Sequence, residues 1–232
     1  MELTYIVLRW LHFLFGITWI GLLYYFNFVQ TPFFAETEAP VRSGAIQKLV
    51  PRALWWFRWG AMGTVIVGWL YVLMKWTEQG GEFLQSTYGI AILTGGTIGT
   101  IMFLNVWLVI WPNQQVVIAS AVAAATGGQA DPKAAPAGRR AGLASRTNTL
   151  FSFPMLFFMG SASHFPSLVS NVTGSGIVLW IIIVGGIVAA VEANALVGTQ
   201  GPTKKPLDSV PAVIHSGIIL TVVLVLLIWL LV

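Results

Sequence analysis

The chain has 232 residues, of which 56% are hydrophobic and only 9% are charged, and its formal net charge is +4. Soluble domains carry roughly 25% charged residues, so this composition excludes an ordinary soluble domain and predicts a polytopic protein of the lipid bilayer. The sequence has no cysteine, which excludes disulfides, thiolate-bound iron–sulfur clusters and covalently attached c-type haem. The few positive charges lie between the apolar stretches, so they indicate membrane topology and no nucleic-acid partner.

Six apolar stretches follow one another along the chain, and a helix that crosses a bilayer needs about 20 apolar residues. They lie at about 3–29, 53–75, 87–111, 147–166, 174–197 and 210–232. The fourth is the least apolar because it contains Ser152, Pro154 and Ser161, a composition typical of a helix inside the bundle. We therefore expect one all-α membrane domain over residues 1–232, a polytopic bundle of six transmembrane helices.

The basic residues predict the orientation of the bundle. Ten of the twelve lysines and arginines lie in or beside the connections after the first, third and fifth stretches, and only Arg9 and Lys75 lie on the other side. Positively charged connections stay in the cytoplasm, so both termini are expected outside (N-out, C-out). Residues 113–146 form the longest connection and are expected in the cytoplasm. The many Ala, Gly and Pro residues within 119–142 predict that this connector is mobile.

Ionisable side chains within the predicted helices are candidates for function, because burying each one costs at least about 2.5–3.5 kcal/mol. Three of them, Arg9, His12 and His164, form an outer layer near the outside face. Neutral imidazole is a common axial ligand of haem, so this layer predicts a haem b site. His12 would be an iron ligand, and His164 would be either the second ligand or a residue at the outer mouth. The alternative is that His12 only forms a hydrogen bond with a neighbouring helix.

Two neighbours of His12 fit the haem interpretation. Gly16 lies four residues later on the same helical face, where the missing side chain leaves room for a flat ring. Arg9 lies about one turn outward, where its guanidinium is placed to pair with a haem propionate.

A second, inner layer consists of Arg58, Glu192 and His215, each about five residues from the cytoplasmic end of its stretch. Because they share a depth, we expect them to form a buried polar cluster, the least costly way to keep such groups in lipid. Either the cluster is a structural ion-pair network, or it is a path for protons or anions from the cytoplasm.

Four phrases together resemble a known family: RWLHFLFGITWIG, PRALWWFRWGAMGT, NVWLVIWPNQQVV and NTLFSFPMLFFMGSASHFP. They are similar to the N-terminal membrane domain of the bacterial membrane-bound urate oxidase (urate hydroxylase) family, most clearly from the first through the fourth helix. The residues that match the family's motifs are His12, Arg58, Asn148 and His164. Gly60 stands where the family's W-F-[KR]-W phrase is expected to continue with glutamate, so the resemblance implies the scaffold and leaves the activity open.

The resemblance implies a haem-b-binding or redox-associated membrane subunit, either an oxidoreductase itself or a non-catalytic subunit of one. The urate-oxidising members carry a cytochrome c domain, whereas this sequence has no C-x-x-C-H. We therefore expect electrons to pass to a cytochrome c on a separate chain. The alternative is a cofactor-free accessory subunit that stabilises a larger respiratory or oxygenase complex together with other membrane subunits.

Overall fold

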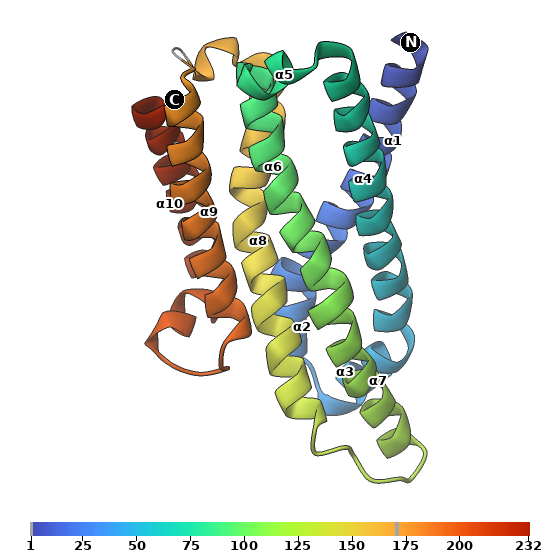
Figure 1. Ribbon diagram of the computed structural model, residues 1–232. Coiled ribbons are helices and arrows are strands. Elements are labelled where there is room, and N and C mark those ends of the chain that lie inside the picture. The colour runs from blue at the N-terminus through green and yellow to red at the C-terminus, as the bar shows by residue number, and fades with distance from the viewer. Residues whose placement is uncertain (1, 170–171) are drawn as a thin grey trace.

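Both chain termini lie at the same end of a bundle of long helices (Figure 1). The structure, a computed structural model, describes residues 2–169 and 172–232, and these residues form helices and no strand, which confirms the all-α prediction. The helices are α1 (Glu2–Tyr24), η1 (Tyr25–Gln30), α2 (Thr31–Glu36), α3 (Ala39–Lys48), α4 (Val50–Gln79), α5 (Gly81–Gln85), α6 (Thr87–Leu104), η2 (Asn105–Ile110), α7 (Trp111–Ala125), α8 (Ala134–His164), η3 (Pro166–Leu168), α9 (Gly174–Leu196), η4 (Pro202–Leu207) and α10 (Val210–Leu231).

The chain passes along the bundle in α1–α2, α4, α6–α7, α8, α9 and α10 (Figure 1). Within the described residues, five of these passes are long and apolar enough to span a membrane, and the exception is α8. α8 packs against α6, α7, α9 and α10, so most of its surface faces protein and not lipid. This central place explains its lower hydropathy, because neighbouring helices can satisfy polar groups that lipid cannot. The protein is therefore an all-α polytopic bundle.

Two π-helical segments, η1 and η2, interrupt the first and third passes without ending them. Each is followed at once by a proline, Pro32 after η1 and Pro112 after η2. A proline has no N–H to donate, and its ring collides with the carbonyl group four residues earlier, which lies within the π segment in both cases. The wider π turn is one way for a helix to continue through such a proline, and π segments also occur at functional sites.

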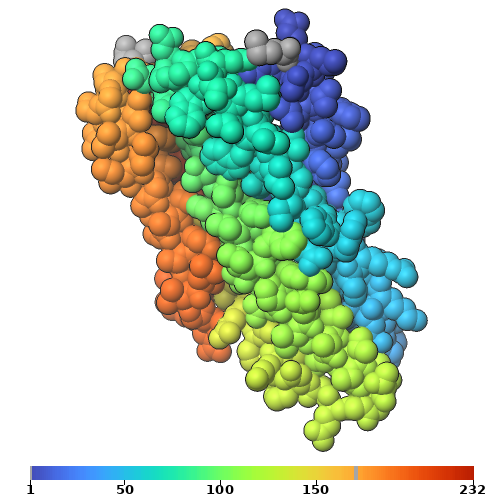
Figure 2. Space-filling view, turned by 45° about the vertical axis from the view of Figure 1, so that its right-hand side comes forward, coloured from blue at the N-terminus to red at the C-terminus, as the bar shows by residue number. Residues whose placement is uncertain are grey.

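The long connection differs from the mobile connector expected over 113–146. α7 continues to Ala125 and α8 begins at Ala134, so only residues 126–133 lie outside the two helices. Alanine has the highest helix propensity, so the alanine-rich flanks extend both helices, and Gly127, with a φ of 83°, follows the end of α7. The tip of this hairpin projects beyond α9 at the end opposite the termini (Figures 1 and 2).

We call this end of the bundle the basic end and the other the terminal end. The connections at the basic end, with the adjoining helix ends, contain Arg42, Lys48, Arg52, Lys133, Arg139, Arg140, Arg146, Lys204 and Lys205. The structure brings these residues to one end, as the topology prediction requires, and that prediction assigns the basic end to the cytoplasm.

α1 and α4 pack closely at Gly60, and this close contact predicts how a substitution there affects stability. A Cβ atom added there would lie 3.1 Å from the Trp19 backbone nitrogen and 3.3 Å from the Phe15 carbonyl oxygen. Gly60→Val should therefore push the two helices apart and destabilise the protein by about 1–3 kcal/mol, measured as a lower melting temperature in detergent. Gly185→Val is the matched control, because a Cβ at exposed Gly185 meets nothing within 4 Å. Equal melting temperatures for the two variants would contradict this description of the contact.

Candidate functional site

A cavity of about 720 Å³ lies between α1, α4, α6 and α8. Most of its lining is apolar, and its volume is within the range of about 300–1,000 Å³ usual for ligand pockets. All four residues predicted for the haem site, Arg9, His12, Gly16 and His164, line this one cavity. Two segments more than a hundred residues apart in the sequence therefore meet at a single candidate site, which we call the outer cavity.

The His12 ring is oriented by the backbone of α4. Its Nδ1 atom lies 3.0 Å from the Thr64 carbonyl oxygen, so the neutral ring donates its Nδ1 proton to that oxygen. The hydrogen bond fixes the tautomer and leaves the Nε2 lone pair available, which is the usual arrangement of a metal-binding histidine. Gly68 allows this approach, since a Cβ there would lie 2.9 Å from the ring's Cε1 atom. The hydrogen bond to a neighbouring helix, expected as the alternative to ligation, is thus present and compatible with it.

Arg9 lies at the mouth of the outer cavity beside an aromatic partner from α4. Its Nη2 atom donates a hydrogen bond of 2.6 Å to the Tyr71 hydroxyl, and its guanidinium carbon lies 5.4 Å from the centre of the Tyr71 ring. The Tyr5 ring packs edge-on against Tyr71, with 5.2 Å between the ring centres. Arg9 is exposed, so its charge stays close to polar surroundings while the hydroxyl positions it. Sequence reasoning missed Tyr71, because no motif links it to Arg9.

α8 contributes the opposite wall. His164 ends the helix and is exposed, whereas Met159 and Met155 line the cavity more than one and more than two turns further into the bundle, respectively. Methionine thioether is a further axial ligand type for haem, and sequence reasoning did not consider it here. The signal was available, because Met155 and Met159 are four residues apart on one helical face and Met159 lies five residues before His164.

The predicted inner cluster does not form, and this prediction was wrong. The Arg58 guanidinium carbon lies 4.0 Å from the Trp111 ring centre and 4.9 Å from that of Trp107, a cation–π arrangement between α4 and the α6–α7 pass. His215 is exposed on α10, and neither it nor Arg58 forms an ion pair with Glu192 within the described residues. Equal depth along helices does not fix the rotation about their axes, so residues at one depth can face different neighbours.

Glu192 instead belongs to a network of amides in the middle of the bundle. Asn105 Nδ2 donates to Glu192 Oε2 (3.0 Å) and to Asn148 Oδ1 (2.9 Å). Asn148 Nδ2 in turn donates to the Met102 carbonyl oxygen (2.8 Å). The network ties α6 and η2 to α8 and α9, and Asn148 is fully buried within it. These contacts indicate a structural role for Asn148.

The comparisons with known proteins identify the family. The family model described as urate oxidase N-terminal matches residues 70–227, which is more than half of the chain. The chain belongs to the urate oxidase N-terminal family. No curated protein and no solved structure matches it.

The residues covered by the urate oxidase N-terminal match differ from those in which the four quoted phrases placed the clearest resemblance. It includes α9 and α10, where the resemblance was expected to be weaker, and it begins within α4. His164 and Asn148 therefore lie inside the matched region, whereas Arg9, His12 and Gly16 precede it. The outer cavity is built from both parts of the chain.

Proposed function

We propose that this member of the urate oxidase N-terminal family is a haem-b-binding membrane subunit that passes electrons to a cytochrome c on a separate chain. One observation carries the proposal: His12, with its Nδ1 proton committed to the Thr64 carbonyl, lines the same apolar cavity as His164, Gly16 and Arg9. We propose the bacterial inner membrane as its location, because the basic end fits the cytoplasmic side of such a membrane.

The residues of the outer cavity fit haem b in three respects. His12 would bind the iron through Nε2, while the Thr64 carbonyl keeps the ring in the required tautomer and orientation. The second ligand would come from α8, either His164 at the mouth or Met159 deeper in the cavity. Arg9 and the Tyr71 hydroxyl, already joined by a hydrogen bond, would bind the propionates. The haem would supply reversible one-electron chemistry.

The place of the cavity supports the direction of electron transfer. Arg9 and His164 line the mouth near the terminal end, which the charge distribution assigns to the outside of the membrane. A soluble cytochrome c docked at this end would be close to the cofactor. With the cytochrome c on a separate chain, the membrane subunit itself would not need a covalently attached haem.

The test is a reduced-minus-oxidised absorption spectrum of the purified protein, expressed with sufficient haem. We expect a b-type Soret band in the wild type and its loss in His12→Ala. His215→Ala is the matched control, because it removes an exposed histidine that does not line the outer cavity, and its spectrum should equal that of the wild type. Pigment-free wild-type protein that co-purifies with other membrane proteins in fixed stoichiometry would contradict the proposal and favour the cofactor-free accessory subunit.

A further inference from the structure

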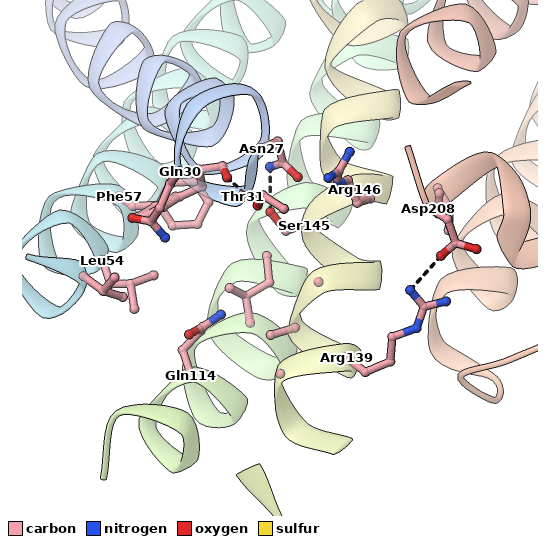
Figure 3. A pocket seen from close by; sticks show the side chains of 17 residues that line it. Asn27, Gln30, Thr31, Leu54, Phe57, Gln114, Arg139, Ser145, Arg146 and Asp208 are labelled. Atoms are coloured by element: carbon pink, nitrogen blue, oxygen red, sulfur yellow. Dashed lines mark hydrogen bonds and ion pairs between the residues drawn. The ribbon is translucent and has the colours of Figure 1, made fainter. Parts of the chain in front are cut away.

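A second cavity, of about 290 Å³, lies at the basic end between η1, α4, α7 and α8 (Figure 3). No residue lines both this cavity and the outer cavity, so the two sites are distinct. Leu54 and Phe57 of α4 form an apolar wall on one side, and Arg146 of α8 lies on the other side (Figure 3). We call it the basic-end cavity.

Arg146, which lines this cavity, forms no ion pair within the described part of the chain. Its side chain is only 9% exposed, and its Nη1 atom is buried without a hydrogen-bond partner among the described residues. Arg139, which also lines the cavity, is different: its Nη1 atom lies 2.7 Å from Asp208 Oδ1, and its Nε donates to the Thr199 carbonyl oxygen. The single carboxylate in the lining is thus already paired, and the cavity carries one positive charge in excess.

Neutral polar side chains also line the basic-end cavity. Ser145 Oγ accepts a hydrogen bond of 2.8 Å from Asn27 Nδ2, which leaves the serine proton available to another acceptor. Gln30 lines the cavity too, and its Oε1 atom is buried without a partner. Rotating that amide by half a turn would present its NH2 group instead. With the amide turned in this way, Gln30 and Ser145 would each offer a neutral donor to an anion in the cavity.

We infer that the basic-end cavity binds a small organic monoanion, with its carboxylate on Arg146 and its apolar part against Leu54 and Phe57. A buried cation without a counter-charge is strongly unfavourable, and an anion with two oxygens satisfies a guanidinium in the geometry that arginine prefers. The apolar wall favours an organic anion over a bare halide, because the apolar part of an organic anion would pack against this wall and be removed from water. This inference goes beyond the haem proposal and does not depend on it.

The test is a thermal-shift titration of the purified full chain in detergent with benzoate, using benzamide as its neutral analogue and chloride as an inorganic anion. We expect benzoate to raise the melting temperature in a saturable way by a few degrees, on the order expected for a ligand well above its Kd. Benzamide should have no such effect, because it lacks the charge that Arg146 requires. Chloride should have little effect at the same concentration.

Two variants and one control decide the result. Arg146→Gln should lose the benzoate response, with affinity reduced at least about tenfold, whereas Arg140→Gln removes an exposed charge of the same helix and should keep it. Gly142→Leu offers an independent check, because a Cβ at Gly142 meets nothing within 4 Å and a leucine there would occupy the cavity while Arg146 remains. An equal benzoate response in Arg146→Gln and wild type, or a response to chloride without one to benzoate, would overturn the inference.

Discussion

Gly68→Ala is expected to weaken haem binding by about 10- to 100-fold while leaving the helix bundle folded. The added Cβ would lie 2.9 Å from His12 Cε1 and 3.0 Å from its Nδ1, so the ring must turn away from α4. Turning breaks the hydrogen bond to the Thr64 carbonyl and points Nε2 in another direction. Alanine is a better helix former than glycine, so α4 itself should not be destabilised. The measurement is the haem content of purified protein against added haem concentration, with circular dichroism as the check on folding.

Gly21→Ala is the matched control for this experiment. Gly21 also lines the outer cavity, yet a Cβ there meets no atom within 4 Å. We expect its haem content to equal that of the wild type. A Gly68→Ala protein with unchanged haem affinity would mean that the orientation of His12 does not matter, and the ligand assignment would then fail.

The outer cavity was predictable in part, because two kinds of sequence information agreed on it. Hydropathy and loop charge placed Arg9, His12 and His164 near one face of the membrane, and each of them lines the cavity. The contacts that orient them, His12 with Thr64 and Arg9 with Tyr71, were not predictable. They depend on how α1 and α4 are rotated about their axes relative to each other. The pattern of apolar residues does not fix that rotation, because these helices are apolar both where they face lipid and where they face protein.

The same limitation explains the failure of the predicted inner cluster. Arg58, Glu192 and His215 share a depth, but Arg58 faces tryptophans, Glu192 faces Asn105 and His215 is exposed. A charged residue in a membrane helix needs a favourable partner, and an aromatic face or an amide serves as well as an opposite charge. The membrane depth estimated from the sequence identifies which charged residues need a partner, but it does not determine which partner each one contacts.

Helices lie along each of the six predicted apolar stretches, and local sequence chemistry extends several of them beyond the expected bounds. Alanine-rich flanks lengthened α7 and α8 into the expected connector, and the first and third passes continue as helix through Pro32 and Pro112 by way of η1 and η2. The composition of α8 marked it as an interior helix, and its contacts with four other long helices confirm that place. Its polar residues are therefore structural candidates, and Asn148 is the clearest of them.

Asn148→Leu is expected to destabilise the protein by about 1–3 kcal/mol, because leucine of similar size removes both of its hydrogen bonds in the bundle interior. The Met102 carbonyl and one proton of the Asn105 amide lose their partner, and no water can reach a side chain that is 0% exposed. The measurement is the melting temperature in detergent, at about 2–4 °C per kcal/mol for a chain of this size. Asn113→Leu is the control, since within the described residues the Asn113 side chain bonds only to the Val109 carbonyl of its own pass.

The haem spectrum of Asn148→Leu should stay unchanged, because Asn148 does not line the outer cavity. The double variant Asn105→Leu/Asn148→Leu should lose less stability than the sum of the two single variants, because the two amides share one hydrogen bond. Additive losses would show that the two side chains act independently and would contradict the network. A lost spectrum in a still-folded Asn148→Leu protein would instead give this residue a role at the cofactor. Its position on α8 outside the lining of the outer cavity argues against such a role.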